Sequence, residues 1–178
     1  MNHEYRAVLA KVDAKFADIR GRHEASFGCR NGCHACCAPG LRVATVEQQH
    51  LAEHIRMTPG LRTQLEALAA ADPHGGTRCA LLMADGACAV YEARPLICRS
   101  HGAPVRVREA GQVRLDVCSL HFRGVQLAAL PPGDCIDVET LNTLLFVVNR
   151  RAHPDDAGER HLLTLEAILA ADDPRLKP

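Results

Sequence analysis

Hydrophobic residues recur at three- and four-residue steps near the start of the chain. Within residues 4–24 this spacing is shared by Tyr5, Val8, Leu9, Val12, Phe16 and Ile19. Side chains spaced in this way lie on one face of an α-helix. The pattern therefore predicts an amphipathic helix over residues 4–24, with its apolar face turned to a core.

Four later segments are also predicted to be helical. Thr45 begins a helix to about Met57, since Gln48 follows three residues later as in a capping box. Thr58-Pro59 begins another that ends near Ala71, because proline is favoured in the first turn of a helix. Asp137 caps a helix to about Arg151, and a last helix covers 159–171. The apolar face of the 137–151 helix consists of Leu141, Leu144, Leu145 and Val148.

Other segments are typical of strands and turns. Residues 79–91, CALLMADGACAVY, predict two short strands around Asp85-Gly86, a dipeptide that favours hairpin turns. Residues 104–118 predict a second hairpin, because apolar and polar residues alternate along them. Shorter predicted features are an extended segment at 41–43, a helical turn at 94–99 and a turn at 131–134.

These elements predict a mainly α fold with small β-hairpins. A chain of 178 residues is long enough for one domain with its own core, and we expect a single domain over 1–178. Its parts are an N-terminal helix (1–26), a cysteine-cluster core (27–120) and C-terminal helices (121–178). The expected architecture is an irregular, cysteine-rich metal core clasped by helices.

Charge and composition narrow the classes of function. The 21 basic and 21 acidic residues give zero formal net charge, which disfavours a nucleic-acid-binding protein. The sequence contains no run of 18 apolar residues, so no membrane span is predicted. The charged N-terminus lacks the apolar core of a secretory signal. We therefore expect a cytoplasmic protein that does not bind membranes. In that reducing compartment, nine cysteines indicate metal ligands or redox thiols.

Four of the cysteines crowd into nine residues, with the spacing Cys29-x3-Cys33-x2-Cys36-Cys37. Thiolates are soft ligands that select zinc, Cu(I) and iron–sulfur clusters. Ligands two or three residues apart can wrap one centre. Adjacent Cys36 and Cys37 must either serve two centres or lie in a tight turn, because neighbouring side chains of an extended segment point in opposite directions. A disulfide between these two neighbours is the alternative.

Five cysteines follow downstream: Cys79, Cys88, Cys98, Cys118 and Cys135. In a regular hairpin around Asp85-Gly86, Cys79 and Cys88 would lie about 13 Å apart, at ~3.3 Å per residue. One metal ion cannot bind both cysteines across that distance. The hairpin is therefore distorted, or the cysteines serve two sites.

The runs "CRNGCHACC" and "RCALLMADGACAVYEARPLICRSHG" resemble the YkgJ-type cysteine-cluster family, a zinc- or iron-chelating CxxxCxxCC domain. The resemblance covers about residues 25–120. It implies eight metal ligands: Cys29, Cys33, Cys36, Cys37, Cys79, Cys88, Cys98 and Cys118. Cys135 falls outside the pattern, so we expect a buried thiol there. Related clusters occur in flagellin lysine N-methylases, which implies that some members support protein modification.

The spacing favours an iron–sulfur cluster over zinc. Zinc ribbons usually contain two C-x2-C pairs, and only Cys33 and Cys36 have that spacing. Iron–sulfur sites often combine a compact run with one remote cysteine, and Cys29, Cys33 and Cys36 with Cys98 would suit a [4Fe-4S] cluster. Zn²⁺ is the alternative. Radical S-adenosylmethionine enzymes share the first spacing, but their alternating strands and helices do not match the helical start of this chain.

Three functions follow from these patterns. The first is an iron–sulfur protein with a redox or accessory role in protein modification, acting with an unknown protein or redox partner. The others are a zinc-stapled structural or interaction module, and metal storage or delivery. Nearby side chains receive structural interpretations. His34 and His101 are expected in loops, His50 and His54 on an exposed polar helix face beside Glu47 and Glu53, and Arg94 and Arg99 in supporting contacts.

Overall fold

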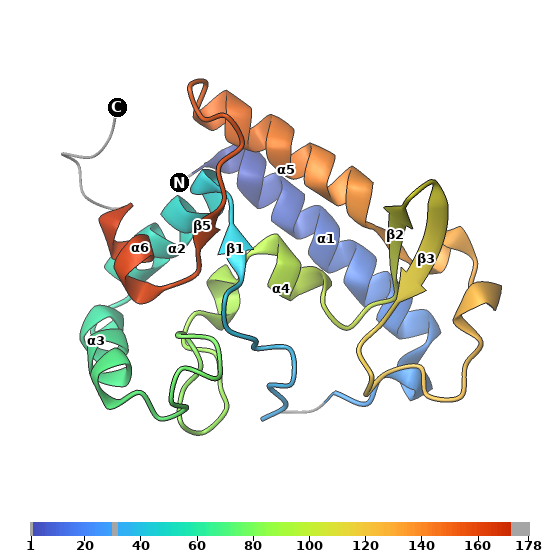
Figure 1. Ribbon diagram of the computed structural model, residues 1–178, viewed down its shortest axis with the longest axis horizontal. Coiled ribbons are helices and arrows are strands. Elements are labelled where there is room, and N and C mark those ends of the chain that lie inside the picture. Colours follow the sequence, from blue (N-terminus) through green and yellow to red (C-terminus); the bar gives the residue numbers. More distant parts are fainter. Residues whose placement is uncertain (1, 30–31, 172–178) are drawn as a thin grey trace.

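The structure is a computed structural model that describes residues 2–29 and 32–171 (Figure 1). Its helices are α1 (His3–Arg22), α2 (Thr45–Met57), α3 (Leu61–Ala71), α4 (Leu96–Ser100), α5 (Val138–Ala152) and α6 (Leu165–Ala170). Its strands are β1 (Arg42–Val43), β2 (Val105–Glu109), β3 (Gln112–Asp116), β4 (Ile136–Asp137) and β5 (His161–Leu162). Short 3₁₀ turns cover Glu24–Ser26, Tyr91–Ala93, Leu127–Ala129 and Pro132–Asp134. The prediction of a mainly α fold with small β-hairpins is confirmed.

The long N-terminal helix α1 follows the predicted pattern. It begins where the side chain of Asn2 accepts a 2.9 Å hydrogen bond from the backbone N–H of Tyr5. Its apolar face is buried against α4 and α5, and Tyr5 and Ile19 are fully enclosed. None of the helices in the described ranges combines the length and apolar character needed to cross a membrane.

Buried side chains form two clusters that both involve α2. Val46, near the start of α2, belongs to the first cluster, together with α1, α4 and α5. Leu51 and Ile55, further along α2, belong to the second, together with α3, α6 and residues 81–93. Helix α2 therefore connects the long helices to the side of the molecule that holds the cysteine loops.

The sheets are small. In one, β2 pairs with β3 in an antiparallel ladder and with β4 in a parallel one. The β2–β3 turn places Ala110 and Gly111 at positive φ, the conformation that suits a tight hairpin, and so the predicted hairpin at 104–118 is confirmed. Its alternating pattern does not bury one face, since Val113 is 47% exposed. The second sheet pairs β1 with β5.

Helix α5 has the predicted start but a narrower apolar face. The side chain of Asp137 accepts a 2.8 Å hydrogen bond from the N–H of Thr140, which confirms Asp137 as the cap. Leu141, Leu145 and Val148 are buried as predicted. Leu144 is exposed, however, because it lies at the edge of the stripe that faces α1.

Two predicted helix caps are wrong, each by a short shift. Thr45 is the first residue of α2, and the preceding N–H of Ala44 donates to the Glu47 side chain over 2.8 Å, so Gln48 forms no capping box. Thr58 ends α2 instead of starting α3. Helix α3 starts after Gly60, whose φ of 76° allows the sharp change of direction between the two helices.

The predicted strands at 79–91 are also wrong. Only an isolated bridge between Leu82 and Cys88 forms, around a turn at Asp85-Gly86. On either side the backbone closes into turns, through hydrogen bonds from Leu82 to Cys79 and from Tyr91 to Cys88. The cysteines therefore lie at turns, where an extended ladder cannot continue. The hairpin is therefore distorted, which was one of the two alternatives that the spacing of Cys79 and Cys88 left open.

The predicted last helix is shorter than 159–171. The backbone N–H groups of Gly158 and Glu159 donate to Asp156, 2.7 Å each, and hold a turn there. Residues 161–162 then pair with β1, and Thr164 caps α6 by accepting from the N–H of Ala167. Long-range pairing with β1 therefore replaces the first turns of the predicted helix.

Among the described residues Glu47 is one of the two most enclosed side chains of the buried polar set, 2% exposed like Asn149. One carboxylate oxygen accepts hydrogen bonds from the Tyr5 hydroxyl (3.3 Å) and the Leu96 N–H (2.9 Å). The other accepts from Ala44, and the guanidinium of Arg160 lies 3.8 Å from it. Burial raises the pKa of Glu47, while these donors oppose the rise. A single carboxylate thus joins α1, α2 and the start of α4.

We expect Glu47→Gln to destabilise the fold. The amide keeps the shape of the side chain but replaces one acceptor oxygen with a donor, so a buried backbone N–H loses its partner. The loss in unfolding free energy should be about 2 kcal/mol in urea denaturation. Glu66→Gln on α3 is the matched control, because Glu66 makes only an exposed ion pair with Arg62. Equal stability of the two variants would contradict this role for Glu47.

Asp156 gives the fold a pH dependence. Burial opposes its charge, but hydrogen bonds from Thr45, Asn149, Gly158 and Glu159 outweigh burial and hold the pKa of Asp156 below its usual range. A depressed pKa contributes stability above the unfolded value of about 4, and that stability is lost as pH falls through the folded value. Asp156→Asn should therefore destabilise the protein at pH 7 and progressively less below about pH 4. A destabilisation that stays constant over this range would exclude the charge as the cause.

Candidate metal centre

All nine cysteines are described and all are free thiols. The alternative of a disulfide between Cys36 and Cys37 is therefore not realised. The cysteines come from separate segments: the loop after α1, the turns before α4, α4 itself, the segment after β3 and the segment before β4. Cys29 and Cys36 are exposed, Cys135 is buried, and the other six are partly buried.

The first loop bends sharply at its adjacent cysteines. The N–H of Cys37 donates to the carbonyl of His34 over 2.9 Å, and that of Ala38 donates to the carbonyl of Cys36 over 2.9 Å. These two short-range bonds confirm the tight turn that was one of the two interpretations of the Cys36-Cys37 pair. The turn lets neighbouring thiols face the same region.

Backbone contacts then bring the second cysteine segment against the first. The N–H of Cys79 donates to the carbonyl of Cys37 over 3.0 Å. Gly86 lies so close to the first loop that a Cβ there would be 3.2 Å from the carbonyl oxygen of Gly32, and its φ is +85°. Figure 1 shows the loop before β1 and the turns before α4 at the same end of the molecule.

The third segment is α4, which carries Cys98. Its first N–H, at Leu96, is held by Glu47, and Pro95 precedes it as the cap. The guanidinium of Arg99 donates to the carbonyls of Arg94 and Glu92 and to the carboxylate of Asp13. Arg94 stacks on the Tyr91 ring, 3.6 Å from its centroid. The structural roles expected for both arginines are confirmed.

The fourth segment places Cys118 beside Cys29. The N–H of Phe122 donates to the carbonyl of Ser26 over 2.7 Å. The two backbones approach so closely that a Cβ on Gly28 would lie 2.4 Å from the carbonyl oxygen of Leu120. Only glycine fits such an approach. The segment 26–29 is thereby held against 118–122, although ninety residues separate them along the chain.

Mutual charge effects divide the eight predicted ligands into two groups. The inner thiols are Cys36, Cys37, Cys79, Cys88 and Cys98, which influence one another's ionisation. The outer thiols are Cys29, Cys33 and Cys118, since Cys33 and Cys118 both raise the pKa of Cys29. Cys36 also acts on Cys29 and is the link between the groups.

Within the inner group, Cys36 is the thiol that ionises most readily. A hydrogen bond from the Cys37 thiol lowers the pKa of Cys36 to about 5, helped by the nearby His101 and Arg94 side chains and opposed by burial. The same hydrogen bond and burial raise the pKa of Cys37. Burial raises the pKa of Cys79 and Cys88, and it raises that of Cys98 to about 12.

This donor set fits a soft, positively charged metal centre. Burial and mutual repulsion prevent the thiols from all ionising together, and a bound cation removes both obstacles. Across the described residues, no three Cys, His, Asp or Glu side chains are already placed to hold one metal ion. The thiols are therefore neighbours without a completed coordination shell.

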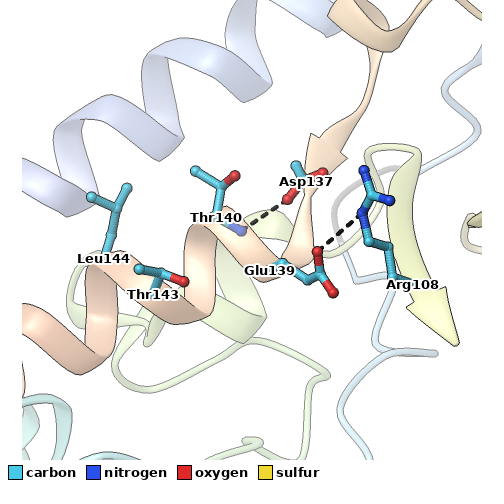
Figure 2. Close-up of a pocket in the computed structure, with 6 residues that line it drawn as sticks. All are labelled: Arg108, Asp137, Glu139, Thr140, Thr143 and Leu144. Atoms are coloured by element: carbon cyan, nitrogen blue, oxygen red, sulfur yellow. Dashed lines mark hydrogen bonds and ion pairs between the residues drawn. The ribbon is translucent and has the colours of Figure 1, made fainter. Parts of the chain in front are cut away.

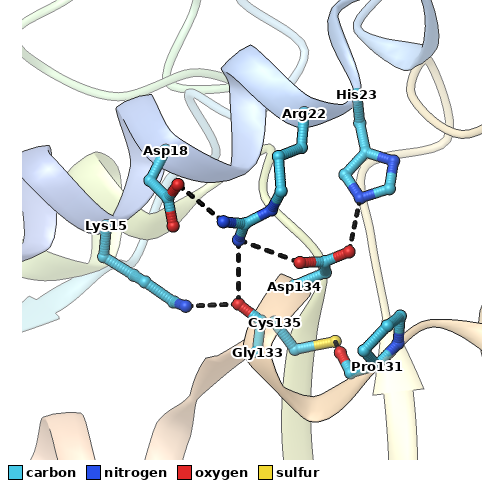
Figure 3. Close-up of polar contacts among 8 residues, drawn as sticks. All are labelled: Lys15, Asp18, Arg22, His23, Pro131, Gly133, Asp134 and Cys135. Atoms are coloured by element: carbon cyan, nitrogen blue, oxygen red, sulfur yellow. Dashed lines mark hydrogen bonds and ion pairs between the residues drawn. The ribbon is translucent and has the colours of Figure 1, made fainter.

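Cys135 lies apart from both groups. It is 4% exposed, and its thiol faces the carbonyl of Pro131 at 3.8 Å, as predicted for a buried thiol outside the cluster. Figure 3 shows it beside a polar cluster in which Asp134 pairs with Arg22 (2.8 Å) and His23 (2.7 Å). These contacts fasten the end of α1 to the chain before β4.

One surface cavity lies away from the cysteines, and another borders one of them. The first, about 350 Å³, lies at the start of α5 and contains the Asp137 cap and the ion pair between Arg108 and Glu139 (Figure 2). These are ordinary structural contacts. The second, about 780 Å³, is bordered by Gly28, Cys33 and His34. Of the cysteines, Cys33 lines this cavity.

Sequence reasoning misjudged several polar residues near the site. The expected exposed face of α2 is wrong, since Glu47 is buried and His50 packs edge-on against the Tyr5 ring at 5.3 Å. His121, 5% exposed, escaped notice because nothing in its immediate sequence marks it. Its Nδ1 lies 2.7 Å from the carbonyl of Gly102. His34 and His101 lie in loops as predicted.

Comparison with known proteins supports metal binding by this part of the chain. The sequence model of the CxxCxxCC family, described as a putative zinc- or iron-chelating domain, matches residues 28–119. The match covers more than half of the chain and spans all eight predicted ligands. No curated protein and no solved structure matched the chain.

Gly28→Ala should separate the outer thiols. The added methyl collides with the Leu120 carbonyl, so residues 26–29 must move away from 118–122 at a cost of about 1–3 kcal/mol. Gly21→Ala is the control, because Gly21 lies in α1 with open space around it, and alanine there should add about 0.5–1 kcal/mol of stability. Opposite signs in thermal unfolding are expected. Two variants of equal stability would contradict the close approach at Gly28.

Proposed function

The chain belongs to the CxxCxxCC family of zinc- or iron-chelating domains, and we propose that it holds an iron–sulfur cluster through its cysteines. The proposed metal ligands are the eight cysteines that span the family match, and a [4Fe-4S] cluster takes four of them. In this proposal the protein is cytoplasmic and has a redox role or an accessory role in protein modification, together with a protein or redox partner. The cluster, a [4Fe-4S] centre, would supply one-electron transfer when bound.

One observation supports the cluster most strongly. The inner thiols come from three segments, 36–37, 79–88 and α4. The charge of one thiolate raises the pKa of its neighbours, so the thiols lie close together. Iron–sulfur sites accept this combination of a compact run with remote cysteines. The spacing Cys79-x8-Cys88 is unlike the paired C-x2-C of zinc ribbons.

The surrounding residues suit a negatively charged centre. A cluster held by four thiolates carries net negative charge, which the nearby charge of Arg94 would offset. Arg94 is fixed in place by its stacking on Tyr91 and its hydrogen bond to the Tyr91 carbonyl. Hydrogen bonds and charge around a cluster tune its reduction potential. Arg94 would therefore favour the more negative, reduced state.

A zinc-stapled module is the second candidate, and one observation favours it. Between α3 and α4 the chain forms only turns, an isolated bridge and one 3₁₀ turn, so regular hydrogen bonding alone holds this segment weakly. A structural zinc ion contributes folding energy in such irregular segments. Under this alternative the helices present a surface to a partner, and metal storage or delivery would require exchangeable metal.

Metal analysis of protein purified without oxygen tests the proposal. We expect about four irons and four sulfides per chain in a cluster, with visible absorbance that bleaches on reduction. Cys36→Ser should remove most of the bound iron, because Cys36 lies between both groups of thiols. Cys135→Ser is the matched control and should retain it. One or two zinc ions with no visible absorbance would replace the redox role with the zinc-stapled module.

A further inference from the structure

His121 carries a buried nitrogen atom that the fold leaves without a partner. Its side chain is almost fully enclosed, and Nδ1 lies 2.7 Å from the carbonyl oxygen of Gly102. A carbonyl can only accept, so Nδ1 bears the proton and Nε2 presents a lone pair. In the described residues no hydrogen-bond partner faces Nε2. Buried polar atoms are rarely left in this state, and each such case calls for an explanation.

The imidazole is held firmly in this orientation. Gly102 has a φ of +103°, and a Cβ there would lie 2.9 Å from Cε1 of His121, so the backbone of Gly102 fits directly against the ring. The Phe27 ring also packs against the imidazole, 4.9 Å between centroids. A fixed ring with a defined tautomer is the usual form of a histidine that binds a metal, in which one N–H donates to a backbone carbonyl.

His121 also belongs to the segments that carry the outer thiols. Its N–H donates to the carbonyl of Cys118 over 2.8 Å, which closes one turn. Phe27, against which its ring packs, comes two residues before Cys29. The backbone N–H of the next residue, Phe122, donates a hydrogen bond to the carbonyl of Ser26. Both polypeptide segments that supply Cys29 and Cys118 are therefore in contact with this histidine.

We propose that Cys29, Cys33, Cys118 and Nε2 of His121 bind one divalent metal ion of the zinc type, at a site separate from the inner thiols. This inference rests on the proposed function, because it divides the eight proposed metal ligands and leaves the inner thiols for the iron–sulfur cluster. Three thiolates and one imidazole form a common tetrahedral ligand set for zinc. The ion would give the buried nitrogen its partner.

The two groups of thiols are supported by different contacts. The inner thiols depend on the bond from Cys79 to Cys37 and on α4, whereas the outer thiols depend on the approach of Gly28 to Leu120. The cavity bordered by Cys33 and Gly28 offers an entry path for an ion from solvent. His34 borders the same cavity but faces His74, with 6.4 Å between ring centroids. His34 therefore serves as the matched histidine for comparison.

The test uses the full chain, stripped of metal under reducing conditions and titrated with Zn²⁺. Four proteins are compared: wild type, His121→Asn, Cys118→Ser and His34→Asn. Asparagine at 121 can still donate to the Gly102 carbonyl but has no distal nitrogen. We expect His121→Asn and Cys118→Ser each to bind one zinc equivalent fewer than wild type, while His34→Asn binds as wild type. A full zinc count in His121→Asn would overturn the proposal.

A second measurement keeps the proposal testable if His121→Asn does not fold, as judged by circular dichroism. Zinc-edge X-ray absorption of the zinc-loaded wild type should show nitrogen as well as sulfur around the metal. A purely sulfur environment would overturn the imidazole ligand. Failure of the proposed function is distinguishable, because protein purified without oxygen would then hold no iron–sulfur cluster, whereas the zinc titration still compares His121→Asn with wild type. Failure of this inference alone leaves wild-type binding intact and unaffected by the histidine.

Discussion

The buried carboxylate of Glu47 is the contact on which the arrangement of the molecule depends. It accepts hydrogen bonds from Tyr5 and Leu96, which lie 42 and 49 residues away in the sequence, and from its own helix start at Ala44. A buried acceptor that satisfies several donors is costly to lose, since each donor is then left unpaired. Through Leu96 the same carboxylate sets the position of α4, and therefore of Cys98.

The cysteine segments are held together by fewer contacts than the helices. Backbone hydrogen bonds from Cys79 to Cys37 and from Phe122 to Ser26, with the close approach of Gly28 to Leu120, bring them together. The thiols that meet there resist ionisation because they are partly buried and repel one another. A cation reverses this balance, and its binding energy then becomes folding energy for these loops. The helices supply a frame, and the loops depend on the metal.

Patterns of local origin were predictable, and long-range ones were not. The three- and four-residue spacing of apolar residues predicted α1 and α5, and Asp137 predicted the start of α5, because each of these signals lies within one helix. Thr45 does begin α2 as predicted, but its hydroxyl donates to Asp156, 111 residues later, and forms no capping box with Gln48. Strand β5 depends on β1 in the same way. The eight proposed ligands came from the cysteine motifs and the family that they resemble. His121 has no local signature and stands out only through its contact with Gly102 and its unpartnered Nε2.

Hydrogen exchange of the backbone amides, with and without bound metal, tests most directly whether metal holds the cysteine segments together. The account predicts that chelation speeds exchange in residues 32–41 and 77–95 and around 118–122, while the amides of α1 and α5 stay protected. Those helices are secured by the buried core and by Glu47 without help from a metal. Unchanged exchange in the cysteine segments after complete metal removal would contradict the account.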